Sequence, residues 1–237
     1  GTYASATSAL EFLSFGVKTE IESEKIDAIS VHRGFKRRVQ LNKNVKGSLE
    51  HNFHPVEGVL LWAVTLGGGV ATTSPSTGVN IHSITAGNFD TAPSSFSLNV
   101  RKGDTHTWRY SGCRGNQLKL TANAGELVKC SYDLIAVDST QQSDDIATSL
   151  SISAQVPFTF VEGFYRYAAT EAAAATTTVE EPIQGFELTI NNNLEDGKAA
   201  RRLGSRILQV LPARQRDIGF KITQRFDTTT AFSRFTQ

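Results

Sequence analysis

Residues 45–53 read Val-Lys-Gly-Ser-Leu-Glu-His-Asn-Phe and alternate strictly between an apolar or small side chain and a polar one. A period of two residues is typical of a β-strand that buries one of its faces. Strands are predicted in further segments of the chain: 79–84, 96–100, 118–121, 127–137, 157–161, 186–190 and 218–226. The chain is therefore expected to be mostly β.

One amphipathic helix is predicted between Pro55 and Leu66. Pro55 suits a first helical position, Gly67 can end the helix, and one face of it is apolar, with Val56, Val59, Leu60 and Ala63. A single helix among about ten strands predicts an all-β fold with one flanking α-helix, arranged as a two-sheet β-sandwich or barrel.

We expect residues 1–20 to form an N-terminal arm and residues 21–237 to form a single β-sandwich domain. The segment Phe96-Ser97-Leu98-Asn99-Val100 resembles Phe186-Glu187-Leu188-Thr189-Ile190. This similarity predicts two interleaved half-repeats, at about 21–138 and 150–237.

Three segments lack the alternation and are predicted to be long loops: 23–44, 67–78 and 162–182. Loops of this length are usually functional or disordered. Two interpretations stay open: they order on another copy of the chain and act as assembly devices, or they are mobile surface.

The formal charge is +1, but basic minus acidic residues give +4 for 1–125, −9 for 126–200 and +6 for 201–237. Such a layout either lets copies attract one another or reflects chance clustering on solvated faces. The overall balance argues against a protein that coats nucleic acid, which would carry a basic excess. The longest apolar run, residues 59–64, is too short to cross a bilayer.

No catalytic constellation is found, so neither an enzyme nor a cofactor is predicted. Gly67-Gly68-Gly69 follows a helix, whereas a dinucleotide fingerprint follows a strand. His51 and His54 lack a Cys, Asp or Glu at ligand spacing, and His51 is expected to point the same way as Leu49.

The two cysteines, Cys113 and Cys130, are expected to be reduced. If a hairpin closes on residues 123–125, Cys130 lies opposite Leu118; if it closes on residues 124–125, the partner is Lys119. Neither register brings the cysteines within the ~7 Å between Cα atoms that a disulfide needs.

Several motifs resemble those of siphophage tail tube (major tail) proteins, over roughly residues 20–226. In the first half the motifs are Gly47-Ser48-Leu49-Glu50, Pro55, Leu66-Gly67-Gly68, Ser95-Phe96-Ser97-Leu98, the "Gly-Cys-x-x-x-x-Leu" strand within 110–120, and Gly125-Glu126-Leu127. In the second half they are Pro157-Phe158-Thr159-Phe160 and Phe186-Glu187-Leu188-Thr189-Ile190-Asn191-Asn192. The chain departs from the family in ending soon after Phe226: either this copy is short or the natural chain continues beyond Gln237.

The resemblance implies a structural subunit that forms hexameric rings, which stack into a hollow cylinder through which viral DNA passes. It implies a protein of the virion tail that is assembled in the host cytoplasm, with no membrane partner. Its partners would be other copies of itself, a tape measure protein inside, and tail terminator and distal tail proteins at the ends. DNA would be transiting cargo.

Under this interpretation the inter-subunit contacts are expected in the N-terminal arm, the loops and the basic cluster. The candidate residues are Tyr3, Phe12, Lys36, Arg37, Arg38, Gly67, Gly78, Glu162, Glu180 and Glu181. The cluster 36–38 is expected to meet the acidic part of a neighbour near Glu180 and Glu181. A lumen position is disfavoured, because cations there would hold phosphates. The alternatives are the inner tube of a contractile tail or secretion-type system and, less favoured, a carbohydrate-binding β-sandwich.

Overall fold

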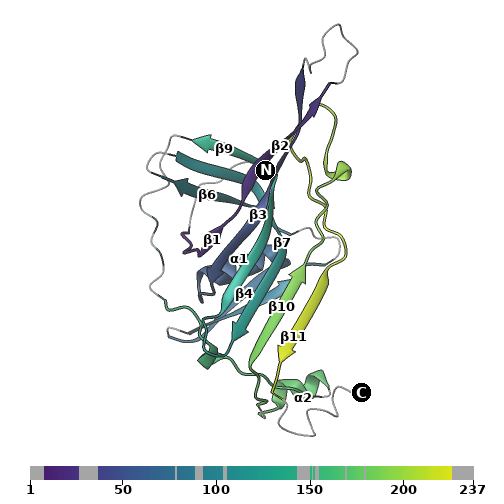
Figure 1. Ribbon diagram of the computed structural model, residues 1–237. Helices are drawn as coiled ribbons and strands as arrows, with labels where there is room; N and C mark the ends of the chain where they lie inside the picture. The colour runs from purple at the N-terminus through teal and green to yellow at the C-terminus, as the bar shows by residue number, and fades with distance from the viewer. Residues whose placement is uncertain are drawn as a thin grey trace.

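The computed structural model describes residues 8–26, 37–77, 79–88, 93–103, 106–142, 150, 152, 155–168, 170–178 and 180–225. Within them it confirms a mostly β fold with two sheets and a helix of ten residues, α1 (Glu57–Leu66) (Figure 1). The nine-stranded sheet consists of β1 (Ser14–Phe15), β2 (Lys18–Lys25), β3 (Arg38–Asn52), β6 (Phe96–Lys102), β7 (His106–Asn123), β8 (Lys129–Ala136), β9 (Asp138–Gln142), β10 (Gly185–Asn191) and β11 (Asp217–Thr223). The second sheet is the hairpin of β4 (Gly67–Ser76) and β5 (Val79–Ala86). The shorter helical segments are α2 (Glu171–Thr176) and the 3-10 turns Phe160–Glu162 and Lys198–Ala200.

The strands of the large sheet follow the order β1-β3-β8-β7-β10-β11, and every neighbouring pair is antiparallel. β2 continues the β1 edge along β3 in the same register, since Ser14 lies opposite Glu50 and Lys18 opposite Lys46. β7 is 18 residues long and belongs to two layers. Its first part pairs with β6 and β9, and its last part pairs with β8 and β10.

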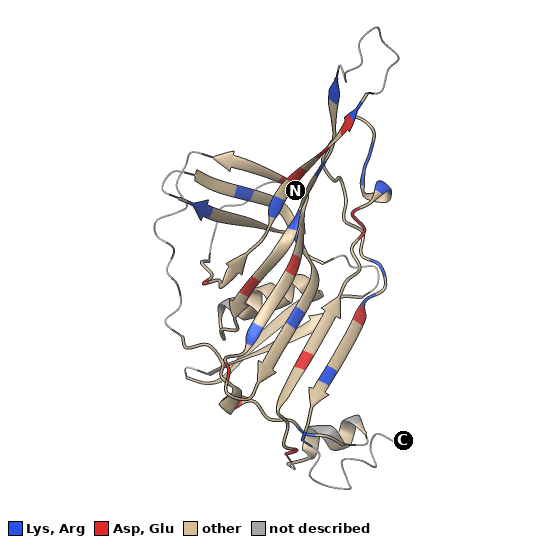
Figure 2. Cartoon of the chain, viewed as in Figure 1, with Lys and Arg blue, Asp and Glu red and all other residues tan. Residues whose placement is uncertain are grey.

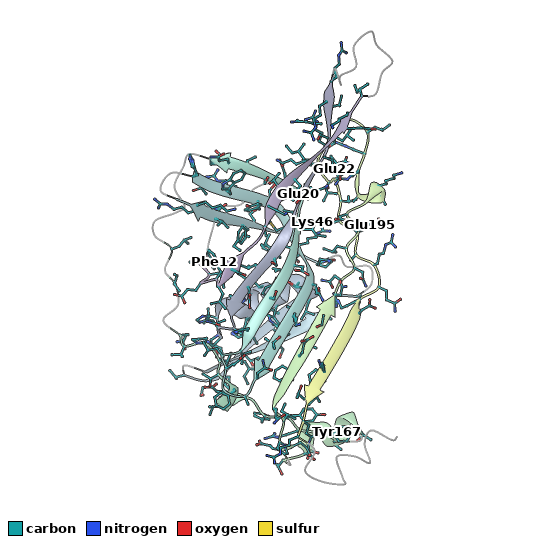
Figure 3. All side chains as sticks on the ribbon, viewed as in Figure 1. Phe12, Glu20, Glu22, Lys46, Tyr167 and Glu195 are labelled. Atoms are coloured by element: carbon teal, nitrogen blue, oxygen red, sulfur yellow. The ribbon has the colours of Figure 1, made fainter. Side chains whose placement is uncertain are left out.

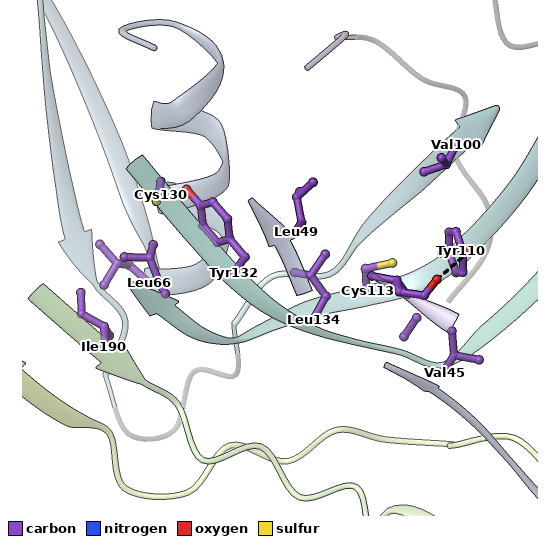
Figure 4. Packing of buried hydrophobic residues seen from close by; sticks show 13 residues of the cluster. Val45, Leu49, Leu66, Val100, Tyr110, Cys113, Cys130, Tyr132, Leu134 and Ile190 are labelled. Atoms are coloured by element: carbon purple, nitrogen blue, oxygen red, sulfur yellow. Dashed lines mark hydrogen bonds between the residues drawn. The ribbon is translucent and has the colours of Figure 1, made fainter. Parts of the chain in front are cut away.

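The core lies on the face of the sheet that α1 covers (Figures 1 and 4). Leu49, Tyr132, Leu118 and Ile190 lie opposite one another on four successive strands, and none is more than 5% exposed. Each such side chain stabilises the fold by roughly 1.5–3 kcal/mol relative to an exposed one. Cross-strand alternation therefore produces one apolar and one polar face, as the pattern at 45–53 predicts.

The predicted helix is confirmed with its end at Gly67, but it begins at Glu57 rather than at Pro55, and Val56 and Leu60 of its predicted apolar face are 57% and 52% exposed. Gly67 has φ 71°, in the left-handed region, and its backbone N–H bonds to the carbonyl of Ala63. Glycine reaches this conformation without the steric cost that a Cβ atom brings. Trp62, on this helix, and Trp108 both pack against the core.

Two of the predicted loops are wrong where the structure describes them. Most of the described part of 23–44 lies in the hairpin of β2 and β3, and residues 67–76 form β4. Polar side chains hold the first hairpin: Glu22 accepts hydrogen bonds from Asn42 and Asn44. The apolar residues of β3 here, Val39 and Leu41, are 42% and 40% exposed, so this hairpin buries little apolar surface.

The predicted strand at 157–161 is also wrong. Only an isolated bridge joins Thr159 to Leu127, and the 3-10 turn begins at Phe160. Glu162 caps this turn, because its carboxylate accepts bonds from the backbone N–H and hydroxyl of Thr159 at 2.6 and 2.5 Å. The pairing is short: Val128 N–H donates to the carbonyl of Phe158, Phe160 N–H donates to that of Glu126, and the capped turn then ends it.

The hairpin of β7 and β8 is confirmed, but its register differs from both alternatives, since Cys130 lies opposite Leu120. Both cysteines are free and buried, which confirms their reduced state in the structure. In the proposed N-terminal arm, residues 14–15 and 18–20 pair with β3. The half-repeats at 21–138 and 150–237 stay a prediction.

Candidate assembly surfaces

The large sheet turns a polar face away from α1. On its lower part, acidic and basic residues are interspersed among neighbouring strands (Figure 2), and Lys119 on β7 forms an ion pair with Glu187 on β10 at 2.9 Å. A shallow hollow of about 360 Å³ lies on this face, lined by Glu50, Lys119, Thr121, Asn123, Glu126, Lys129 and Ser131. Oppositely charged residues are thus interspersed within one concave polar surface.

The upper part of the same face is covered by the connection between β10 and β11. Ile135, on β8, packs there in a second small core with Leu194, Ala200, Leu208 and Leu211. Arg114 donates to the carbonyl of Leu211 at 2.5 Å, and burial lowers the pKa of this guanidinium. The open polar face is therefore confined to the lower half of the sheet.

Both edges of the sheet carry exposed apolar side chains. On β11, Ile218 is 65% and Phe220 54% exposed, although they lie opposite the core residues Ile190 and Leu188. At the other edge Leu13 is 53% and Phe12 50% exposed, and the Phe12 ring packs edge-on against Phe15. Edge strands with exposed apolar residues are templates for pairing with another chain.

An aromatic pocket of about 310 Å³ opens near the end of β7. Its walls include Phe53, Phe158, Phe160, Phe164 and Phe186. The loop beside it is fastened to the body, because Tyr165 bridges to Glu181 and its ring lies 6.4 Å from that of Phe220. Within the described parts of 162–182, the predicted loop thus contains α2 and this bridge.

A family model of phage tail tube proteins matches residues 1–237, the whole chain. The chain belongs to the phage tail tube protein family. No curated protein matches it. The chain is therefore a structural subunit of a phage tail tube and a component of the virion, and neither the secretion-type nor the carbohydrate-binding alternative is favoured.

Some predicted contact residues of this tail tube subunit lie at two opposite ends of the molecule, whereas Phe12 precedes β1 at the sheet edge and Gly67 ends α1 at the start of β4. Arg37 and Arg38 stand exposed at the far end of the β2–β3 hairpin, and Glu180 lies in the loop near α2 (Figures 1 and 2). Glu180 accepts a hydrogen bond from Arg166 at 3.1 Å. Tyr3, Lys36 and Gly78 lie outside the described residues.

The sequence patterns missed the edge residues of β11 and the charges of the polar face. Figure 3 draws the side chains of these elements. Phe12, Glu20 and Lys46 are labelled toward one edge, and Tyr167 is labelled near α2. The exposed apolar positions 218 and 220 alternate with polar ones, as a half-buried strand does. Their exposure depends on the strand's place at the edge, and sequence alternation does not record that place.

Burial keeps the two thiols of the tail tube subunit protonated. Burial raises the pKa of the Cys113 thiol to about 12 and that of Cys130 to about 11. His51 is fully buried beside Leu49, as predicted, and stacks on Tyr132 at 5.6 Å. Among the described residues no group of three His, Cys, Asp or Glu side chains is placed to hold a metal ion, and no described helix is long and apolar enough to span a membrane.

Proposed function

We propose that six copies of this subunit close into a ring, that rings stack into a hollow tube, and that the open polar face of the sheet lines the lumen. The observation that carries this proposal is the two-faced sheet. One face is buried under α1, and the other is concave, polar and uncovered over its lower half. The face of the sheet that lines the lumen must be in contact with water, whereas the opposite face must stay buried inside the tube wall.

The charges of this face suit DNA that passes without being held. Tight binding to a nucleic acid backbone needs several cations that neutralise phosphates together. Lys119 is instead paired with Glu187, and Lys129 shares its hollow with Glu50 and Glu126. Interspersed carboxylates weaken the attraction for phosphates, so that DNA slides past as cargo.

Stacking is assigned to the two ends of the molecule. The β2–β3 hairpin and the loop that contains Glu180 and Glu181 project from opposite poles (Figure 1). In a head-to-tail stack these poles meet, which places the basic cluster 36–38 against the acidic loop of the next ring. Heterologous contacts of this kind leave an open filament in the axial direction. Further contacts are proposed for the arm with Tyr3 and Phe12, for Gly67 at the start of β4, and for Gly78 and Glu162.

The remaining partners follow from the tube itself. We assign a tape measure protein to the lumen during assembly in the host cytoplasm, and tail terminator and distal tail proteins to the two ends. A non-contractile tail is assigned. No catalytic role is assigned.

Negative-stain electron microscopy of the purified protein tests this function. We expect rings with six-fold averages and hollow tubes, whereas a monomer that persists at high concentration would overturn the proposal. The charge reversal Arg37→Glu with Arg38→Glu is expected to shorten tubes and lower their salt tolerance. Lys198→Glu with Arg202→Glu, both exposed on the β10–β11 connection, is the matched control. Unchanged tubes in the first variant would refute the proposed contact of the cluster.

A further inference from the structure

We propose that the aromatic pocket near the end of β7 binds residues 226–237 of the same chain, which follow β11, and that the side chain of Phe226 occupies it. Residues 226–237 lie outside the described residues. The inference goes beyond the proposed function and does not depend on the ring, because the pocket and the segment belong to one subunit. It assigns the pocket to an intramolecular contact that completes the core.

The pocket is the open end of the hydrophobic core. Leu120 packs against the core cluster and also lines the pocket, together with Ala122 two residues further along β7. Phe186 of β10 lies opposite Ala122 and forms part of the same wall. Phe53 joins the pocket to the core, because its ring lies 5.8 Å from that of Trp62 on α1. An apolar side chain in the pocket therefore extends the core of the subunit.

Aromatic rings of the pocket wall are exposed to water. Phe160 is 44% and Phe164 is 64% exposed, although the guanidinium of Arg166 lies over the Phe164 ring at 4.5 Å. Exposed apolar surface that surrounds a hollow marks a binding site. The walls hold five phenylalanines in all, and aromatic rings prefer edge-to-face or offset contact with one another. The pocket therefore suits an aromatic occupant.

The described chain ends beside this pocket. Thr223, the last residue of β11, lies opposite Gly185, and its carbonyl accepts a hydrogen bond from the backbone N–H of Gln184 at 2.7 Å. Gly185 and Gln184 both line the pocket. The end of β11 and the start of β10 lie side by side at the lower end of the sheet (Figure 1). The chain thus leaves β11 one strand spacing, about 4.8 Å, from the pocket wall.

The alternation of β11 directs Phe226 toward the pocket. Ile222 lies opposite Phe186, so both side chains are on the face of the sheet where the pocket opens. An extended continuation of β11 sets Gln224 and Phe226 on that same face, since side chains alternate between the two faces of a strand. Phe226 follows Thr223 by three residues, which gives it a reach of about 10 Å.

The tether favours the same chain over any other occupant. Residues 226–237 contain three phenylalanines, at 226, 232 and 235, among small and polar residues, and Phe226 has the shortest connection to β11. A segment on a short flexible connection acts at an effective concentration of about 1 mM. At micromolar protein concentration, a second copy or another protein would have to bind about a thousandfold more tightly to displace it.

Photo-crosslinking with isotope-labelled chains tests this contact. In the full chain, Phe226 is replaced by the photoreactive analogue p-benzoylphenylalanine, which keeps an aromatic side chain at this position. Equal amounts of isotope-labelled and unlabelled protein are mixed before assembly, irradiated and digested. By mass spectrometry we expect links from position 226 to peptides that contain Phe53 or Phe160, each link within one isotope. Links between a labelled and an unlabelled peptide, or links outside the pocket, would overturn the proposal.

The control places the same analogue at Leu203. This residue is fully exposed in the connection between β10 and β11, so the analogue there is equally accessible but is not tethered beside the pocket. We expect no links from position 203 to the pocket peptides. Equal labelling of the pocket from positions 203 and 226 would show that the pocket reacts with any analogue, and the assignment of Phe226 would fail.

Removal of the ring gives a second measurement on the unassembled protein. In Phe226→Ala we expect the fluorescence of anilinonaphthalene sulfonate, a dye that binds exposed apolar surface, to rise several-fold over the wild type. Phe235→Ala removes the same ring from the same segment and should leave dye fluorescence unchanged. Equal fluorescence in the two variants would overturn the proposal.

The two tests separate this inference from the proposed function. The cross-linking variant keeps an aromatic side chain at position 226, so its result decides the question even if Phe226→Ala does not fold. Both measurements are made without reference to rings or tubes. A failure of the pocket assignment therefore leaves the proposed ring standing, and a protein that forms no rings leaves the pocket assignment standing.

Discussion

The side-chain amide of Asn192 donates a hydrogen bond to the main-chain oxygen of Thr65 at 2.9 Å, across 127 residues of sequence. The same nitrogen donates to the carbonyl of Gly115 at 2.9 Å, and the amide oxygen accepts from Arg216 at 2.8 Å. Arg216 also donates to the carbonyl of Leu66. The last turn of α1 is thereby fastened to β7 and to the residues before β11, which satisfies carbonyls that a helix end leaves unpaired.

Asn192→Ala is expected to lower the free energy of unfolding by about 2–3 kcal/mol, because it removes the amide that donates to the buried carbonyls of Thr65 and Gly115 and one of the two acceptors of Arg216. Urea unfolding of the unassembled protein measures this loss. Asn42→Ala is the control, since its amide donates to the exposed Glu22 at 2.8 Å, and a loss below about 0.5 kcal/mol is expected there. Equal losses in the two variants would show that the Asn192 network adds no stability.

Substitutions of two adjacent glycines should differ sharply in their effect on stability. A Cβ atom on Gly68 would lie 1.9 Å from the backbone oxygen of Thr85, whereas one on Gly69 would meet nothing closer than 3.8 Å. We expect Gly68→Ala to destabilise the protein by about 1–3 kcal/mol through displacement of β5, and Gly69→Ala to be nearly neutral. Thermal unfolding of both variants checks this, and a harmless Gly68→Ala would contradict the observed packing of β4 on β5.

The native thiols should resist alkylation. With pKa values of about 12 for Cys113 and about 11 for Cys130, thiolate is scarce at pH 8, and thiolate is the reactive form. Iodoacetamide at pH 8 should therefore leave the folded protein unmodified by mass, and label both cysteines once denaturant is added. Because the shifts are upward, rising pH alone brings reactivity only as it approaches these values. Rapid labelling of the folded protein would show that the core opens.

Glu187→Lys should leave tubes intact but slow the release of DNA. The substitution breaks the ion pair with Lys119 and adds positive charge to the face assigned to the lumen, where phosphates would be held. Ejection followed by a DNA dye in variant phage measures the rate. Glu11→Lys makes the same charge change near His54, which precedes the start of α1. This substitution is expected to leave the rate of ejection unchanged. Equal effects would argue against the lumen assignment.

The elements that bury a face were predictable from sequence, and the elements held by backbone or polar contacts were not. Alternation found the strand that contains Leu49 and the β7–β8 hairpin, and periodicity found α1. Alternation also found β5, but its partner β4 was predicted to be a loop, because its sequence is rich in Gly, Thr and Ser and its large apolar residue Val70 is 45% exposed.

The site was less predictable than the fold for a related reason. Arg37 and Arg38 stood out as a run of like charge, and the structure places them exposed at the end of a hairpin. Phe220 did not stand out, because a core strand and an edge strand share the same alternation. Whether a strand is covered depends on its neighbours in the sheet, which are set by the tertiary topology.

The continuity of β7 has a mechanical consequence. When a hollow cylinder with a two-layer wall bends, the layers tend to slide past one another. β7 runs through both layers as a single covalent backbone, so sliding within a subunit would require breaking its ladders with β8 and β9. In the stack of rings proposed above, flexure is then confined to the joints between rings, and such a tail behaves as a string of stiff segments.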